Sequence, residues 1–206
     1  LGPNTGGMGA YSPAPVVTAE MHDRIMQTVI IPTVEGMAAD GLPYTGFLYA
    51  GVMINSDGVP KVLEFNCRFG DPETQPIMMR LKSDLVELCE AGVAGKLDTV
   101  TTEWDERSSM GGVLAAGGYP FDYNKGDVIS GLENVGAEDL KVFHAGTKDI
   151  DGEVTTNGGR VLCVVGLGDS VTSAQARAYE GVKQISWDNV YYRDDIGHRA
   201  IAREQS

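Results

Sequence analysis

The feature that most constrains the fold is a pair of short apolar segments separated by a turn. Residues 46–54 (GFLYAGVMI) form the first segment and residues 61–66 (KVLEFN) form the second, and both contain the aromatic and β-branched residues that favour strands. Residues 55–58 (NSDG) between them have the composition of a tight turn. The sequence therefore predicts an antiparallel hairpin, and the continuous apolar run of its first strand indicates that this strand is buried.

Two polar side chains on the second predicted strand are candidates for holding a metal ion. Glu64 and Asn66 lie two residues apart and so point to the same face, while Phe65 points to the other face and can anchor the strand in the core. Magnesium takes hard oxygen ligands and usually accepts only one or two from protein, since water and nucleotide phosphates supply the rest. The pair fits this requirement, although from these three residues alone an ordinary solvent-facing strand is the better interpretation.

The loop after this strand, residues 68–73 (RFGDPE), adds a guanidinium group and two carboxylates. Arg68 is the natural partner of a carboxylate or a phosphate, and Asp71 and Glu73 supply the negative groups. Asp71 also has a plain structural interpretation, as the N-cap of the helix that follows. We interpret the neighbouring Cys67 as a small buried residue, because no base lies close in the sequence to activate its thiol.

A glycine-rich loop opens the chain at residues 2–9 (GPNTGGMG). Consecutive backbone N–H groups in such a loop, here from Gly6 to Gly9, can bind an anion. The loop has neither the Gly-Lys-Ser/Thr of a P-loop nor the spacing of a dinucleotide-binding motif, so a plain surface turn is the alternative. Because independent domains rarely begin with such a loop, we expect the chain to be a fragment whose missing part lies upstream.

Helices are expected on both sides of the hairpin in the first half of the chain. Thr18 can cap a helix that breaks or restarts at Pro32 and stops at residues 40–41 (DG), and Ser83 can cap another. The composition then becomes polar over residues 97–107, where we place a domain boundary. The predicted domains are residues 1–103 and 104–206.

The second half is predicted to be a small α+β domain. Its expected strands are residues 112–116, 141–145 and 160–167. A helix follows, because Thr172 and Gln175 have the spacing of a capping box. The inner stripe of this helix is Ala174, Ala178, Val182 and Ile185. We interpret residues 157–159 (NGG) as a hairpin turn, and His144 as a structural hydrogen-bonding residue without assigned chemistry.

Composition excludes several classes of partner. The 206 residues carry a formal net charge of −13, which opposes binding to the phosphate backbone of a nucleic acid. No apolar run has the length needed to cross a membrane. The three cysteines are odd in number and far apart, so they suggest neither a disulfide framework nor a zinc site, and they favour a reducing compartment such as the cytoplasm.

Five segments in a fixed order resemble one enzyme family. They are residues 2–13 (GPNTGGMGAYSP), 63–75 (LEFNCRFGDPETQ), 115–120 (AAGGYP), 142–147 (VFHAGT) and 156–162 (TNGGRVL). Together they cover essentially the whole chain, and as a set they are highly specific. The chain resembles the glycinamide ribonucleotide synthetases (phosphoribosylamine–glycine ligases) of the ATP-grasp superfamily.

The resemblance implies a fold and an activity. The expected fold is α+β, with the C-terminal part of an ATP-grasp core, an antiparallel sheet with helices, followed by a small α+β C-terminal domain. The expected reaction is the ligation of glycine to 5-phosphoribosylamine through a glycyl phosphate, which converts ATP to ADP and phosphate in de novo purine biosynthesis. The family's metal, Mg²⁺ or Mn²⁺, would bind Glu64 and Asn66, and Arg68 would act in catalysis. The expected substrate-binding residues are Asn4, Thr5, Gly6, Gly7, Gly9, Asp71 and Glu73.

The chain departs from the family in its extent. The family also has an N-terminal domain and the half of the ATP-grasp core that supplies the adenine pocket and a phosphate-binding lysine, and neither is present in these residues. We therefore expect the missing N-terminal half to be the main partner, a monomeric enzyme, and a fragment that by itself binds ATP poorly and has no ligase activity. The alternatives are another ATP-grasp carboxylate–amine ligase or a biotin-carboxylase relative, and a non-catalytic binding module in which Glu64 and Asn66 have no role.

Overall fold

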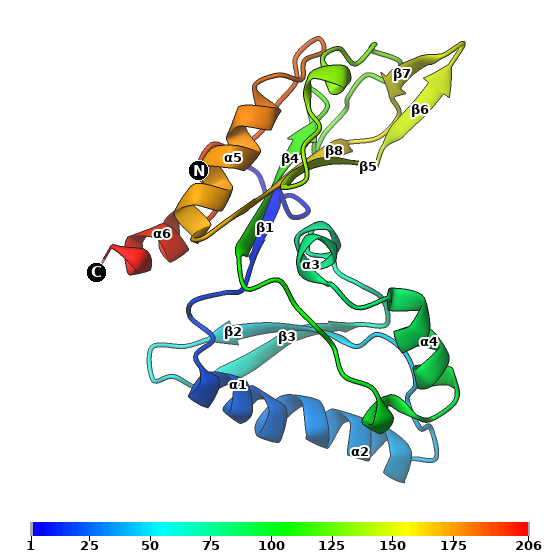
Figure 1. The fold of residues 1–206 in the computed structure, drawn as a ribbon, viewed down its shortest axis with the longest axis vertical. Coiled ribbons are helices and arrows are strands. Elements are labelled where there is room, and N and C mark those ends of the chain that lie inside the picture. Colours follow the sequence, from blue (N-terminus) through cyan, green and yellow to red (C-terminus); the bar gives the residue numbers. More distant parts are fainter. Residues whose placement is uncertain (1, 206) are drawn as a thin grey trace. The chain divides into compact units, whose positions relative to one another are not determined.

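The computed structural model describes residues 2–205 and divides the chain into two compact units (Figure 1). The first unit contains residues 1–13, 71–80 and 105–206, and the second contains residues 14–70 and 81–104. Each unit is built from segments that are separate in the sequence, so each is described by itself.

The first unit is organised around a four-stranded antiparallel sheet. Its strands, in spatial order, are β1 (Gly9–Ser12), β4 (Ser108–Ala115), β8 (Arg160–Gly168) and β5 (Leu140–His144). The two central strands are buried along almost their whole length, which explains their nearly continuous apolar sequences. The three strands predicted for this half of the chain are confirmed, with β4 longer than expected.

Helices cover both faces of this sheet. On one face, α5 (Val171–Val182) packs against β4 and β8, and a Cβ atom added to Gly112 would lie 3.7 Å from Val182 of that helix. On the other face, α3 (Thr74–Arg80) approaches so closely that a Cβ atom on Gly111 would lie 3.2 Å from Pro76. Because neighbouring residues of a strand point to opposite faces, the two glycines identify the two covered sides.

The predicted inner stripe of the long helix α5 is confirmed for Ala174, Ala178 and Val182, which are fully buried. The fourth predicted member, Ile185, is buried but lies beyond the end of the helix at Val182. The predicted capping box at Thr172 is wrong. The helix begins two residues earlier, where Ser170 has an extended backbone and its side chain accepts a hydrogen bond from the Ser173 N–H. Thr172 is therefore already inside the first turn.

Small elements complete the first unit. They are a 3₁₀ turn (Leu132–Asn134), a hairpin of β6 (Thr147–Ile150) and β7 (Glu153–Thr156), and a C-terminal helix α6 (His198–Glu204). The predicted hairpin turn at residues 157–159 is wrong, because β7 pairs with β6 and not with β8. These residues instead carry the chain from the small hairpin into the central sheet.

The second unit begins with a long interrupted helix. Thr18 caps α1 (Ala19–Ile25) by accepting a hydrogen bond from the Met21 N–H at 3.2 Å, as predicted. A π-helical segment (Met26–Ile30) leads into α2 (Ile31–Ala39), so the helix restarts at Pro32, which occupies the first turn. The helix ends at Asp40, and Gly41 follows with a φ of +78°.

The predicted hairpin is confirmed as β2 (Tyr49–Ile54) and β3 (Pro60–Asn66). The Asn55 side chain fixes its turn by accepting hydrogen bonds from the N–H groups of Asp57 and Val59, at 3.1 and 2.8 Å. In Figure 1, α1 and α2 run alongside the hairpin, and Arg24 of α1 donates a hydrogen bond to the Gly58 carbonyl in its turn.

The remainder of the second unit is helical. It comprises α4 (Leu85–Val93) and a 3₁₀ turn (Leu97–Thr99). The predicted cap of α4 is one residue out of place, because Asp84 accepts the hydrogen bond from the Val86 N–H. Ser83 instead accepts a hydrogen bond from the Glu103 N–H.

Burial in the second unit is lower than the sequence suggested. Strand β2 is half-buried, Phe65 is 43% exposed, and Cys67 is exposed. The prediction that Cys67 is buried is therefore wrong, and Phe65 is not anchored in a closed core. The physical reason is that this unit has only a two-stranded sheet, which is too small to enclose its own apolar side chains.

The boundaries of the two compact units can be compared with the predicted domain boundary. A boundary between units falls between Trp104 and Asp105, next to the predicted position. However, residues 1–13 and 71–80 group with residues 105–206, because β1 pairs with β4 and α3 packs against the same sheet. As a division of the sequence into domains, residues 1–103 and 104–206 remain a prediction.

Among the described residues, no helix combines the length and apolar character that crossing a membrane would require.

Candidate substrate and metal site

The candidate metal ligands lie on the second strand of the β2–β3 hairpin. Glu64 pairs with Gly51 and Asn66 pairs with Tyr49, whereas a β-bulge at Leu63 shifts the register before them. Both ligands follow the bulge, so the alternation of the strand keeps them on one face.

The residue opposite Glu64 leaves room for its side chain. A Cβ atom added to Gly51 would come within 3.1 Å of the Glu64 Cγ and within 3.6 Å of the Tyr49 ring. Glu64 thus lies across a glycine and beside an aromatic ring, and its carboxylate is exposed. Its neighbour Phe65 helps to line a cavity of about 290 Å³ together with Val34 and Met37 of α2.

The donor set fits magnesium bound jointly with other ligands. Glu64 and Asn66 offer a carboxylate and an amide oxygen, which are the hard ligands that magnesium prefers. Within residues 2–205, no cluster of three or more His, Cys, Asp or Glu side chains is arranged to hold a metal by itself. A metal at Glu64 and Asn66 would therefore take its remaining ligands from water, from nucleotide phosphates or from another part of the polypeptide.

Arg68 belongs to the same unit as the candidate metal ligands. Its guanidinium is exposed and donates a 2.8 Å hydrogen bond to the Phe69 carbonyl. The Phe69 ring packs on Phe47, with ring centroids 4.2 Å apart. Packing of these rings fixes the start of the loop, while the Arg68 side chain itself remains open to an anionic ligand.

The other predicted residues lie in the first unit, where two predicted loops touch. A Cβ atom on Gly7 would come within 2.4 Å of the Pro72 side chain and 3.5 Å of the Asp71 carbonyl. This is closer than real Cβ contacts allow, so the contact between the two loops requires a glycine at position 7. The glycine-rich loop and the residues after Gly70 therefore form one continuous surface in this unit.

Arg160 joins these two loops and was missed by the sequence reasoning. Its Nη1 donates to the Gly7 carbonyl at 3.1 Å and to the Asp71 carbonyl at 2.7 Å, and its Nη2 donates to the Asp71 carboxylate at 2.8 Å. The side chains of Arg160 and Asp71 are 22% and 51% exposed, so the ion pair is partly shielded from water. Asp71 acts here as an ion-pair partner, and within residues 2–205 its side chain accepts no hydrogen bond from the N–H groups of the following helix.

One of the backbone N–H groups predicted to bind an anion is already hydrogen-bonded to a tyrosine. The Gly6 N–H donates to the Tyr119 hydroxyl at 3.2 Å. The Tyr119 ring in turn lies against Gly159, where a Cβ atom would come within 2.3 Å of it. The loop is therefore held in place by side chains from the second half of the chain, and Gly6 does not present a free N–H.

The other residues predicted to bind substrate lie elsewhere on the first unit. Asn4 is exposed, Thr5 lines a cavity described below, and Gly9 is the first residue of β1, paired with Gly112. Glu73 precedes α3, and its carbonyl accepts a hydrogen bond from the Ile77 N–H. The structure thus brings Gly6, Gly7 and Asp71 together.

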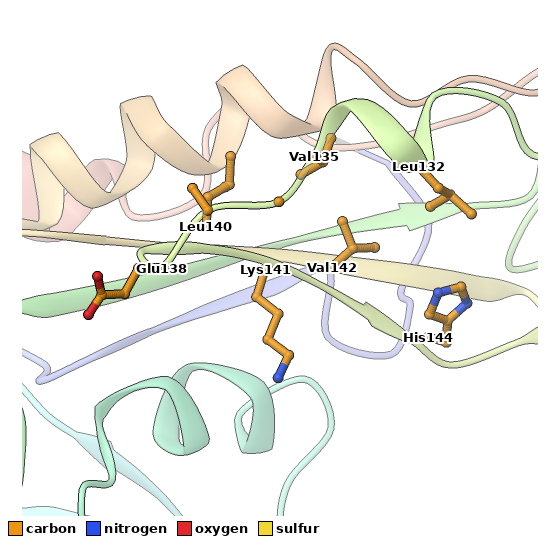
Figure 2. A pocket seen from close by; sticks show the side chains of 9 residues that line it. Leu132, Val135, Glu138, Leu140, Lys141, Val142 and His144 are labelled. Atoms are coloured by element: carbon orange, nitrogen blue, oxygen red, sulfur yellow. The ribbon is translucent and has the colours of Figure 1, made fainter.

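Another cavity, of about 510 Å³, lies beside the edge strand β5 and includes His144 in its wall. Figure 2 shows Glu138 and His144 at opposite ends of this cavity, with the Lys141 side chain pointing away from Leu140 and Val142. His144 Nδ1 lies 3.1 Å from the Thr147 hydroxyl, as expected of a structural histidine. No polar groups converge here, so this cavity does not extend the candidate site.

Two family models match the chain. Residues 1–74 match "Phosphoribosylglycinamide synthetase, ATP-grasp (A) domain", and residues 109–199 match "Phosphoribosylglycinamide synthetase, C domain". The two matches leave residues 75–108 and 200–206 unassigned.

Curated proteins named phosphoribosylamine–glycine ligase are similar to the chain throughout its length. The protein from Vibrio parahaemolyticus is 70% identical over 204 residues, which is 99% of this chain and 48% of that protein. The protein from Escherichia coli O157:H7 is 66% identical over 206 residues, which is 100% of this chain and 48% of that protein. The chain spans about half the length of the curated relatives it matches.

Solved structures agree with these matches. A phosphoribosylamine–glycine ligase from Thermotoga maritima aligns with a TM-score of 0.78 at 36% identity, covering 95% of this chain and 47% of that one. The biotin carboxylase domain of Hydrogenobacter thermophilus 2-oxoglutarate carboxylase aligns with a TM-score of 0.62 at 16% identity, covering 91% and 40%. The second likeness concerns the fold alone, and both agree with the expected mixed fold with antiparallel sheets.

Proposed function

Because the chain belongs to the phosphoribosylglycinamide synthetase family, we propose that the protein containing it ligates glycine to 5-phosphoribosylamine at the expense of ATP. In this reaction the glycine carboxylate attacks the γ-phosphorus of ATP, which releases ADP and leaves glycyl phosphate. The amine of phosphoribosylamine then attacks the acyl carbon, loses a proton and expels phosphate, giving glycinamide ribonucleotide. The observation that carries the proposal is the strand that holds Glu64 and Asn66 on one face, opposite a glycine.

In this proposal Glu64 and Asn66 hold a divalent ion on the ATP phosphates. Oxygen ligands suit Mg²⁺ and Mn²⁺ alike, and Mg²⁺ is the ion we propose. Such an ion offsets negative charge on the transferred phosphoryl group, which is most of what phosphoryl transfer requires from a protein.

The cationic and loop residues orient the substrates. Arg68 carries a guanidinium that can pair with a substrate carboxylate or with the phosphoryl group, and we assign it to catalysis. The loop of residues 4–9, with Asp71 and Glu73, is assigned to substrate binding. Its support is the contact between Gly7 and residues 71–72, which Arg160 stabilises.

The test is a substitution in the full-length protein. Glu64→Gln keeps the size of the side chain but removes the carboxylate. We therefore expect glycine-dependent ADP release to fall at least about a hundredfold, and the Mg²⁺ concentration needed for half-maximal activity to rise. Glu90→Gln is the matched control, since Glu90 is an exposed residue of α4 in the same unit. Both variants should unfold at the temperature of the parent protein.

Two results would count against the proposal. Unchanged turnover in Glu64→Gln would remove the assigned metal ligand and favour a non-catalytic module. ADP release that needs neither glycine nor phosphoribosylamine would point to another ATP-grasp ligase.

Partner and location are further parts of the proposal. We propose that the remaining part of the polypeptide supplies the adenine pocket, that the enzyme is a monomer, and that it works in the cytoplasm. The cysteine pattern supports a reducing compartment, because three distant cysteines are odd in number. Size-exclusion chromatography with light scattering of the full-length protein tests the monomer.

A further inference from the structure

A cavity on the glycine-rich loop is lined by a cation that has no partner among the described residues 2–205. The cavity has a volume of about 390 Å³ and lies wholly within the first unit. Residues 5–9 and Tyr11 form one side, and residues 193 and 195–199 form the other. We call it the Arg199 cavity. Its volume is at the small end of the range, roughly 300–1,000 Å³, that is usual for small-molecule sites.

Two guanidinium groups and one carboxylate line the Arg199 cavity. The guanidinium groups are those of Arg193 and Arg199, and the carboxylate is that of Asp195. Arg193 Nε donates to one Asp195 oxygen at 2.7 Å and Nη2 donates to the other at 2.5 Å. The hydrogen bond from Arg193 lowers the pKa of the Asp195 carboxyl, so this carboxylate is ionised and already paired.

Arg199 is the residue that remains unpaired. Its guanidinium makes neither a hydrogen bond nor an ion pair with any other side chain or backbone group in residues 2–205. The chain as a whole carries a net charge of −13, whereas the exposed Arg199 places a positive charge in a concave site. A bound anion would give this guanidinium a partner that residues 2–205 do not provide.

His198 contributes a second group of fixed orientation. Its Nδ1 lies 2.9 Å from the Asp195 carbonyl. Because a carbonyl oxygen can only accept, Nδ1 is assigned the proton, which leaves Nε2 as the other polar atom of the ring.

The wall that carries these residues is held rigidly. The Tyr179 hydroxyl donates to the Arg193 carbonyl at 2.6 Å and accepts from the Ile196 N–H at 3.3 Å. The Gln175 amide donates to the Ile196 carbonyl at 2.6 Å. The opposite wall is equally close, since a Cβ atom on Gly9 would lie 2.7 Å from the Ile196 side chain. Preformed sites of this kind bind ligands with little loss of conformational entropy.

The side chains, and not the end of a helix, make this site. At the start of α6 the His198 N–H bonds to the Asp195 carbonyl, and the N–H groups of Ala200 and Ile201 both bond to the Gly197 carbonyl. These amides are already satisfied within the protein. Recognition would therefore depend on the guanidinium of Arg199.

We propose that the Arg199 cavity binds the phosphate group of the phosphoribosyl substrate. A guanidinium matches a phosphate in charge and in geometry, and its hydrogen bonds to such an anion are strong. The identity of the sugar phosphate rests on the proposed function, whereas binding of a phosphate monoester rests only on the cavity. The site would place the sugar beside the same loop that contacts Asp71 on its other side.

The first experiment measures binding to the full-length protein by isothermal titration calorimetry. Ribose 5-phosphate and inorganic phosphate are the two probes. We expect saturable binding of ribose 5-phosphate, tighter than that of inorganic phosphate, and on the order of tenfold to a hundredfold weaker in Arg199→Gln. Lys148→Gln is the control, because Lys148 lies on the exposed strand β6 and its loss removes the same charge. Circular dichroism checks that each variant is folded.

Each outcome decides the proposal. Weaker binding in Arg199→Gln with unchanged binding in Lys148→Gln supports it. Equal losses in both variants would show a general charge effect and overturn it, as would equal binding by Arg199→Gln and the parent chain. Absence of saturable binding by either probe would also overturn it. Equal affinity for the two probes would reduce the site to a plain anion site and overturn the sugar-phosphate assignment.

A second experiment separates this proposal from the proposed function. In the full-length protein, Arg199→Gln should raise KM for phosphoribosylamine by a similar factor while KM for glycine and for ATP stays unchanged. A protein that binds ribose 5-phosphate through Arg199 but does not ligate glycine would contradict the proposed function alone. A protein that ligates glycine with an unchanged KM for phosphoribosylamine in Arg199→Gln would contradict the Arg199 proposal alone.

Discussion

At the scale of single residues, Arg160 has the most consequential position in the candidate site. It reaches Asp71 and Gly7, which are 89 and 153 positions away in the sequence. A planar guanidinium can donate to several oxygens at once, and the three hydrogen bonds of Arg160 need that geometry. The residue therefore positions the two predicted substrate loops, even though no spacing in the sequence connects them.

Substitution of Arg160 should loosen both loops at once. Arg160→Met removes the three hydrogen bonds, and we expect a loss of about 1–2 kcal/mol of unfolding free energy, because the ion pair is partly exposed. Arg160→Lys should recover only part of this free energy, since a single ammonium group cannot replace the two guanidinium nitrogens that donate these hydrogen bonds. Urea unfolding measures the free energy, and amide hydrogen exchange of residues 5–8, Asp71 and Glu73 measures the loosening.

Lys183→Gln is the matched control for this prediction, because it removes one exposed positive charge from the same unit, next to α5. Exchange rates in the two loops that stay at parent values in Arg160→Met would show that Arg160 does not hold them.

At the scale of elements, the helix α5 shows how a distant residue completes a local structure. Ser170 caps the Ser173 N–H, which leaves the N–H groups of Val171 and Thr172 to be satisfied. The Glu204 carboxylate, at the end of α6, accepts from both, at 2.6 and 3.1 Å, and from the Thr172 hydroxyl at 2.7 Å. A negative charge at a helix N-terminus is also favoured by the helix dipole.

This cap should make stability depend on pH. Burial alone would raise the pKa of Glu204, but the hydrogen bonds from Thr172 and Val171 outweigh it and lower the pKa below its ordinary 4.5. A carboxyl with a lowered folded pKa stabilises the protein above its unfolded pKa and loses that contribution as the pH falls through the folded value.

Glu204→Gln should therefore cost about 1 kcal/mol at about pH 7, or roughly 2–4 °C in Tm, and little at about pH 3. Thermal unfolding followed by circular dichroism at both values provides the measurement. Glu180→Gln, an exposed position on α5 itself, should shift Tm at neither pH beyond experimental error. A Glu204→Gln effect that is the same at both values would contradict the assignment of the cap to the ionised carboxylate.

At the scale of the whole molecule, the two units differ in how well they bury their apolar side chains. The first has a buried core on both faces of its sheet. The second exposes many of its large apolar residues, including Leu63 at 65%, Val86 at 63% and Val93 at 86%. Exposed apolar surface of this extent is typical of an interface, and the chain spans about half the length of its curated relatives.

We therefore expect activity to require the rest of the polypeptide. The 206-residue chain alone should release no glycine-dependent ADP, because we propose that the rest of the polypeptide supplies the adenine pocket. Addition of the remaining part of the protein, produced separately, should restore measurable turnover, since the exposed hairpin and α4 would regain their partner surface. A coupled ADP assay of each part and of the mixture provides the measurement.

Changes on the exposed face supply the control for this expectation. Leu63→Ser should weaken restoration, whereas Ile150→Ser, at an exposed apolar residue of β6 in the other unit, should not. Glycine-dependent ADP release by the 206-residue chain alone would contradict the expectation.

The sequence by itself determined the local features of this protein. A turn between two apolar segments predicted the β2–β3 hairpin, and the two-residue period of a strand placed Glu64 and Asn66 on one face. The helical period placed Ala174, Ala178 and Val182 in the core. The ordered motifs indicated the family, which the family models then matched. The structural features among these depend on residues close in the sequence, because the backbone geometry of a strand or helix fixes the direction in which each side chain points.

Only the tertiary structure decided which distant residues meet. It paired β1 with β4, brought Arg160 to Asp71, placed Tyr119 on the Gly6 amide, and closed the N-terminus of α5 with Glu204. It also left Cys67 exposed, against expectation. Such contacts depend on the path of the whole chain, and a local period carries no information about that path. For this reason the shared face of Glu64 and Asn66 could be predicted from a triplet, whereas Arg160, which contacts both Gly7 and Asp71, could not be found from local sequence.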